Sequence, residues 1–173
     1  WTCAPYQGVC APRFGEQVAW AESNAIVYVN SVIGARTERY GDYTDLCCAL
    51  TGRAPKFGLH IKKNRLAQII INCEGLPLKS STDDFAVLGY LVGKLAKDKI
   101  PAITGIPQWV TSDQLKAFSA AIASSGAVAM FHMIGITPEA PDLNSILDDS
   151  SNIETIEITK EMYLDSRKSL SSA

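Results

Sequence analysis

The feature that most constrains the fold of this chain is a regular alternation that begins at residue 67. Short runs rich in β-branched and apolar residues alternate there with segments whose apolar residues recur at helical spacing. The strand-like runs are AQIIINC (67–73), IPAIT (100–104) and AVAMFHM (127–133), and the helical segments between them are 83–97 and 112–124. Nearly all-apolar strands joined by crossover helices predict a parallel or mostly parallel sheet that is covered on both faces.

Two weaker units extend this pattern toward the end of the chain. The run IETIEIT (153–159) predicts a further strand, and a closing helix is expected from about Lys160 to Ser169. The fold class is therefore α/β, with a mostly parallel sheet flanked by helices. Ligands of such sheets gather at the carboxyl ends of the strands. The loops concerned start near Glu74, Thr104, Met133 and Thr159.

Residues 1–65 have a different texture, with more polar residues and more glycines. Prolines and glycines interrupt every period before residue 16, so this stretch is expected to be a loop. A helix with a cap at Glu22 and Ser23 should follow and end at Gly34, and a second helix should end at Gly52. We find no linker or internal repeat and expect one domain, 1–173, with a polar portion (1–65) and an alternating β/α portion (66–173).

Composition narrows the class of partner. The chain has 173 residues, of which 47% are hydrophobic, and a net charge of −2, which is typical of a soluble domain with one core. It has no basic block for nucleic acid and no apolar run long enough to span a membrane. Five cysteines, an odd number in a chain of this size, favour a reducing compartment, the cytoplasm by default. Because the chain starts at Trp1 without an initiator methionine, we expect it to be cut from a longer polypeptide.

Arginines are the main candidates for an anion site. Arg36 and Arg39 follow the glycine stop of the first helix, and two guanidiniums on a loop can hold a carboxylate or a phosphate. The alternative is solvated surface charge that answers Glu38 and Asp42. Arg65 in the run KKNR has the same two interpretations.

Histidines and cysteines are less informative. His60 could act as an acid, a base or an orienting group, or could simply be packed, whereas His132 lies in an apolar run and is interpreted as structural. Cys3, before a proline-containing turn, is either a small buried residue or a thiolate ligand for iron. Cys47 and Cys48 diverge by about 100° on a helix, so both cannot readily serve one metal, and core packing is expected for at least one of them. The same is expected for Cys73.

The chain lacks the motifs of the commonest cofactor enzymes and hydrolases. It has no nucleophile elbow, phosphate-binding glycine loop, dinucleotide fingerprint or HExxH sequence. What remains is a soluble α/β domain whose polar first third can form an anion site.

A longer set of motifs resembles a known family. In order and spacing, TCAPY, FGEQVAWAESNAIVYVNSVIGART, ERYGDYTDLCCALTGRAP, GLH with NR, LGYLVGKL, ITGIP and LKAFSAAIASSGAVAMFHMIGITPEAP are similar to the catalytic portion of the aconitase X family, from about Thr2 to Pro141. The resemblance implies a three-layer aconitase-like fold and a hydro-lyase that dehydrates a small hydroxy acid with an iron or iron–sulfur centre. Members resemble cis-3-hydroxy-L-proline dehydratases or phosphomevalonate dehydratases, and ERYGDYTDLCCALTGRAP is closer to the former.

The resemblance also implies site residues. Cys3 matches the metal-ligand cysteine, while further cysteine ligands and the proton-abstracting serine, carried by a small swivelling domain or subunit, are expected outside this chain. The implied substrate-binding residues are Ser23, Asn24, Asn30, Ser31, Arg36, Thr37, His60 and Arg65. We therefore expect the chain alone to be metal-free and inactive, with an exposed apolar patch within residues 1–65. The alternatives to the hydroxyproline reaction are phosphomevalonate dehydration and a non-catalytic module that binds a small anion.

Overall fold

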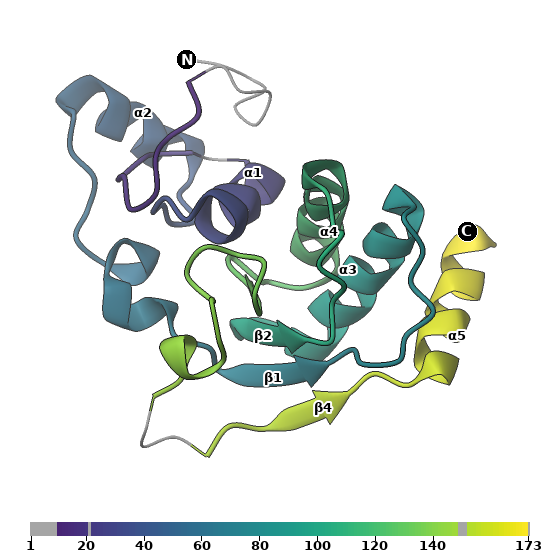
Figure 1. The fold of residues 1–173 in the computed structure, drawn as a ribbon. Coiled ribbons are helices and arrows are strands. Elements are labelled where there is room, and N and C mark those ends of the chain that lie inside the picture. Colours follow the sequence, from purple (N-terminus) through teal and green to yellow (C-terminus); the bar gives the residue numbers. More distant parts are fainter. Residues whose placement is uncertain (1–9, 21, 149–151, 173) are drawn as a thin grey trace.

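A parallel β-sheet forms the centre of the protein (Figure 1). The computed structural model describes residues 10–20, 22–148 and 152–172. Its four strands, all paired in parallel, have the order β3-β2-β1-β4. Their bounds are β1 Ile69–Asn72, β2 Pro101–Thr104, β3 His132–Met133 and β4 Thr155–Glu157. The predicted α/β class with a mostly parallel sheet is confirmed.

Three helices lie on one side of this sheet. They are α3 Thr82–Ala96, α4 Ser112–Ser125 and α5 Lys160–Ser171, and the side chain of the N-cap residue of each accepts a backbone N–H bond. The chain runs from β1 through α3 to β2 and through α4 to β3 in one direction across the sheet, so right-handed crossovers place both helices on the same face. The connection from β3 back to β4 must then cross the opposite face.

Alternate residues of β1 pack against these two covers. Ile69 and Ile71 are buried in the large core cluster with α3 and α4, which includes the edge-to-face pair Phe118–Phe131 with ring centroids 4.8 Å apart. Ile70 points the other way and packs on a second cluster, in which Ala67 and Ala102 meet the segment 134–147 with its short 3₁₀ helix η5, Asn144–Ile146. Both faces are thus covered, one by helices and the other by a mostly irregular segment.

Helices α3 and α4 approach each other through glycines of α3. A Cβ atom added at Gly89 would lie 2.6 Å from the carbonyl oxygen of Phe118, and one added at Gly93 would lie 2.9 Å from that of Ile122. Such distances are shorter than real carbon–oxygen contacts, so the close packing of the two helices requires residues without a side chain at these positions.

The polar first portion contains the two predicted helices. The helix α1, Ser23–Tyr28, continues as a π-helical turn, η2 (Val29–Ile33), and ends at Gly34 with φ 73°. The helix α2, Asp42–Thr51, ends at Gly52 with φ 65°. Both glycine stops are confirmed, and the first helix has its N-cap residue at Glu22, within the predicted pair, although the side chain of Glu22 makes no capping bond. Two 3₁₀ turns, η3 (Gly58–His60) and η4 (Lys62–Arg65), lead to the sheet.

One predicted strand is much shorter than expected. The run 127–133 forms a strand only at His132–Met133. The backbone groups before it bind side chains of η2 instead of a neighbouring strand, since Asn30 donates to the carbonyl of Ala129 and the N–H of Phe131 donates to Ser31. These side-chain to backbone hydrogen bonds connect the first portion of the chain to the segment that precedes β3.

Candidate anion site

A buried arginine organises the residues between the first portion and the sheet. Arg65 is 1% exposed, and its Nε donates to both carboxylate oxygens of Glu139, at 2.9 and 3.0 Å. The terminal nitrogen Nη2 completes an ion pair with Glu139 at 2.9 Å. The interpretation of Arg65 as a solvated surface charge is therefore wrong.

The remaining N–H groups of Arg65 bind backbone and amide oxygens. Nη1 donates to Oδ1 of Asn30 and to the carbonyl of Leu59, and Nη2 donates to the carbonyls of Asn30 and Ala35. Burial lowers the pKa of Arg65, while the hydrogen bonds and charge of Glu139 oppose that shift. Every N–H group of this guanidinium therefore has an acceptor within the protein, and Arg65 acts by holding the surrounding backbone in place.

Asn30 and Thr37 belong to the same framework. Asn30 accepts from the N–H of Thr37 at 3.0 Å and donates to its carbonyl at 3.2 Å. The π-helical turn η2 places Asn30 and Ser31 on the side that faces the segment before β3, and such turns are frequent at functional sites. The structure thus brings three of the predicted residues, Asn30, Thr37 and Arg65, into one hydrogen-bonded cluster.

Arg36 lies beside this cluster and forms no ion pair with any residue that the structure describes. Its backbone is held by the segment 16–18, since Arg36 N–H donates to Glu16 and its carbonyl accepts from Val18. The side chain is half-buried, and its Nε is buried without a hydrogen-bond partner in the described residues. Arg36 is close enough to Arg65 to lower the pKa of that residue. Glu139 compensates the charge of Arg65, whereas no carboxylate of the described residues compensates that of Arg36.

His60 links Gln17 and Tyr40 in a chain of hydrogen bonds next to the segment 16–18. Gln17 Nε2 donates to the carbonyl of His60 at 3.4 Å, which turns Gln17 Oε1 toward His60 Nδ1. Nδ1 therefore carries the proton, and Nε2 accepts from the Tyr40 hydroxyl. Burial lowers the pKa of His60 and raises the pKa of Tyr40 to about 12, so the imidazole is neutral and the phenol protonated.

The beginning of α1 does not join this group. Ser23 is exposed, and Asn24 donates to the carboxylate of Glu22 at 2.8 Å. The eleven residues from Ser23 to Ile33 span about 16 Å at helical rise, so Ser23 and Asn24 lie at the far end from Arg36. Their contact with substrate stays a prediction.

The described residues provide no metal site. Cys3, the predicted ligand, lies outside them. Within them, no three His, Cys, Asp or Glu side chains are grouped to hold a metal ion. Cys48 and Cys73 are buried, as predicted for core cysteines, and burial raises the pKa of Cys73 to about 12, which keeps it a neutral thiol. Cys47 is exposed. An iron centre therefore does not fit the described residues alone.

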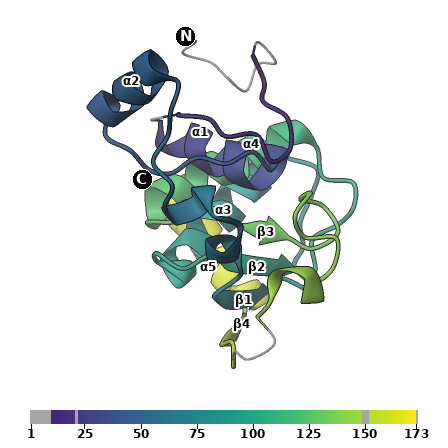
Figure 2. The same ribbon diagram turned by 90° about the vertical axis from the view of Figure 1, so that its left-hand side faces the viewer.

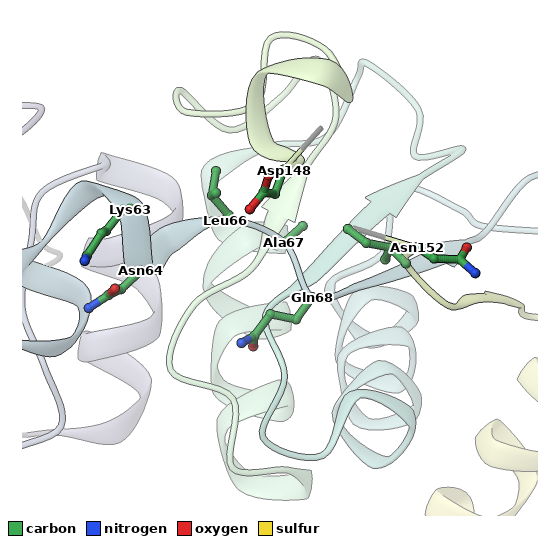
Figure 3. A pocket seen from close by; sticks show the side chains of 8 residues that line it. Lys63, Asn64, Leu66, Ala67, Gln68, Asp148 and Asn152 are labelled. Atoms are coloured by element: carbon green, nitrogen blue, oxygen red, sulfur yellow. The ribbon is translucent and has the colours of Figure 1, made fainter. Parts of the chain in front are cut away.

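A separate cavity of about 510 Å³ lies at the amino end of β1 (Figure 3). It is lined by Lys63, Asn64, Leu66, Ala67, Gln68, Asp148, Asn152 and Ile153. Neither Arg36 nor His60 is among these residues. The loops at the carboxyl ends of the strands, where ligands were predicted, lie at the opposite end of the sheet.

Several residues of the cluster were not anticipated. Gln17, Glu38, Tyr40 and Glu139 all bond to predicted residues or their neighbours, and Glu38 accepts from the N–H of Leu59 at 2.9 Å. Glu139 lies in the loop HMIGITPEAPD, and a carboxylate between two prolines is the one signal that could have identified it. For Gln17 the sequence offers no signal. No helix within the described ranges has the length and apolar character that crossing a bilayer requires.

Comparisons with known proteins agree with these features. Residues 1–63 match the family model described as Aconitase X first domain, and residues 67–168 match Aconitase X second domain. The chain is 48% identical to the cis-3-hydroxy-L-proline dehydratase of Pseudomonas aeruginosa, over 99% of this chain and 30% of the relative. It is 44% identical to the phosphomevalonate dehydratase large subunit of Methanothermobacter thermautotrophicus, over 80% of this chain and 34% of that one.

The fold matches as well. The crystal structure of Thermococcus kodakaraensis aconitase X, in its holo-form, superposes with a TM-score of 0.84 at 34% identity, over 97% of this chain and 42% of that chain. The chain spans about a third of the length of the curated relatives named above. With both family models matched in order and the fold shared, this chain belongs to the aconitase X family.

Proposed function

We propose that this chain is the carboxylate-binding part of an aconitase X hydro-lyase that dehydrates cis-3-hydroxy-L-proline. Two relatives with that name, from Pseudomonas aeruginosa and Hypocrea jecorina, are each 48% identical to it over more than nine-tenths of its length. The phosphomevalonate dehydratase large subunits are 34 to 44% identical over most of the chain. This difference favours the hydroxyproline reaction.

The charge of Arg36, which no carboxylate in the described part of the chain compensates, carries the proposal. A planar guanidinium can bind a carboxylate through two parallel hydrogen bonds, and a half-buried position strengthens that interaction. When the proton next to the carboxylate is removed, negative charge moves onto the carboxylate oxygens. In this proposal Arg36 stabilises that charge, and the bonds of Arg65 to Asn30 and Ala35 support it by fixing the turn that carries Arg36.

Other parts of the reaction are assigned outside the described residues. The base that removes the proton is proposed to be a serine on a small swivelling domain or subunit, and the substrate is a small hydroxy acid. An iron or iron–sulfur cofactor is proposed with Cys3 as one ligand and the others from beyond this chain. The chain alone should therefore be inactive. The described cysteines are all free thiols, which fits a cytoplasmic location.

The test uses the complete product of the gene and cis-3-hydroxy-L-proline as substrate. Arg36→Lys keeps the charge but loses the planar fork, and we expect kcat/KM to fall about 100-fold with little change in thermal stability. Arg39→Lys is the matched control, because Arg39 is exposed three residues away and should tolerate the change. Equal kinetics for the two variants would remove Arg36 from the site.

The same assay separates the alternatives. Phosphomevalonate also carries a carboxylate, so Arg36 could serve either substrate, and turnover of one compound but not the other decides between them. A non-catalytic module would bind a small carboxylate through Arg36 without turnover by the complete product.

A further inference from the structure

The helix α2 buries a carboxyl group and exposes most of its large apolar side chains, the reverse of an ordinary amphipathic helix. Its buried residues are Asp45, which is 8% exposed, and Cys48. Asp45 Oδ1 is buried without a hydrogen-bond partner among the described residues, and burial raises the pKa of this carboxyl. A helix that turns a carboxyl group inward is not placed by the burial of its own apolar face.

The apolar face of α2 points outward instead. It consists of Tyr43, Leu46, Cys47 and Leu50, spaced at i, i+3, i+4 and i+7, and we call it the outer face of α2. Tyr43 is 86% exposed, Leu50 78% and Leu46 44%. In both views α2 stands out from the body of the fold, away from the sheet and from α3 and α5 (Figures 1 and 2). The outer face of α2 is the exposed apolar patch expected within residues 1–65.

The coverage of related chains indicates what lies over this face. The fold of this chain matches the Thermococcus aconitase X over 97% of its own length but only 42% of that chain, so more than half of that polypeptide lies outside the matched unit and is available to cover it. The two faces of the sheet are closed by α3 and α4 and by the segment 134–147. The outer face of α2 has no such cover within the described residues.

The lack of charge on the outer face of α2 favours a permanent partner over a moving one. The outer face contains no charged residue, and uncharged apolar surfaces are typical of obligate interfaces. A domain that swivels during catalysis must release its contact surface into water in each cycle, which favours a more polar contact. A segment of the same catalytic chain has no such requirement.

We propose that the outer face of α2 is a permanent docking surface for the remaining part of an aconitase X catalytic chain. The inference rests on membership of the family and on the exposure of these side chains. It does not depend on which hydroxy acid is the substrate, and its test measures thiol protection and not turnover. Its failure can therefore be distinguished from failure of the proposed reaction.

Cys47 provides a built-in probe of this face. We would treat the complete gene product with a maleimide and follow each cysteine by mass spectrometry, with the same protein in guanidinium chloride as the reference for free labelling. The expected result is that Cys47 reacts at least about 100-fold more slowly in the native protein than in the unfolded one, like the buried Cys73. Labelling of native Cys47 at the unfolded rate would overturn the proposal.

Two further arms identify the occupant. Protection of Cys47 that disappears on dilution would indicate a second copy, and protection that needs the swivelling domain or subunit would indicate that partner; either result would overturn the proposal. Protection independent of both supports it.

A pair of substitutions tests the same face by perturbing it, with labelling of Cys47 again as the readout. Leu46→Lys and Leu164→Lys change leucines of equal exposure, 44% each, on α2 and on α5. In the complete product we expect only Leu46→Lys to speed labelling of Cys47, by about 10-fold or more. An equal effect of the two substitutions would count against α2 as the docking surface.

Discussion

Removing the charge of Glu139 should destabilise the protein through Arg65. The substitution Glu139→Gln keeps the size of the side chain and one carbonyl oxygen but removes the negative charge. Arg65, at 1% exposure, would then be a buried cation beside a second guanidinium, Arg36, with no carboxylate bound to it in the described residues. Breaking a buried ion pair in this way typically costs about 3–5 kcal/mol.

The structure sets where in that range the effect should fall. Glu139 retains 14% side-chain exposure, so water screens part of the interaction, and the four remaining acceptors of Arg65 are unchanged. We therefore expect about 3 kcal/mol. With a urea dependence of about 2 kcal/mol per molar, the unfolding midpoint should move down by about 1.5 M.

The assay is urea unfolding of the 173-residue chain followed by circular dichroism. Glu154→Gln is the matched control, because Glu154 pairs with Lys99 at the surface, where the side chains are 59% and 45% exposed. Surface pairs contribute about 0–1 kcal/mol, so the control midpoint should hardly move. Midpoints for the two variants that agree within error would refute the view that Glu139 compensates a buried charge.

Two further predictions concern packing and pH. Gly89→Ala should lower the free energy of unfolding by about 1–3 kcal/mol despite the better helix propensity of alanine, because the new methyl group would press on the backbone carbonyl of Phe118; Ala86→Gly, on the same helix, separates the propensity effect in the same urea assay. Burial lowers the pKa of His60 and of His132 below the ordinary value of 6.5, so the unfolded chain binds more protons near and below that pH. The free energy of unfolding should be fully retained above about pH 7 and fall as the pH decreases through 6.5 and below. His132→Gln, which keeps an N–H donor for the carbonyl of Arg65, should make that fall shallower; an unchanged slope would mean that His132 does not titrate with unfolding.

Local patterns predicted the framework of the fold. The alternation of β-rich and helical segments after residue 67 gave the strands and helices of the sheet, because these periods depend only on which face of each element is buried. The glycine stops at Gly34 and Gly52 were equally readable, since each is a property of one turn.

Features that depend on distant residues were not predictable in this way. Arg65 was open to interpretation as surface charge because Glu139, its partner, lies 74 residues further along the chain. The strand expected at 127–133 was overestimated because its backbone binds Asn30 and Ser31, about 100 residues earlier. Arg36 was open to two interpretations from the sequence, an anion ligand or a surface charge; the family resemblance favoured a substrate carboxylate, and the structure adds the absence of an ionic partner among the described residues.

The position of Arg65 has a consequence for how the protein opens. It lies between the two matched family domains, 1–63 and 67–168, and its side chain binds Asn30, Ala35 and Leu59 in the first and Glu139 in the second. If either region unfolded alone, Arg65 would lose the hydrogen-bond acceptors or the carboxylate that this region provides. In native-state hydrogen exchange, the amide of Thr37 and the central amides of the sheet should therefore report one opening free energy, as members of a single cooperative unit.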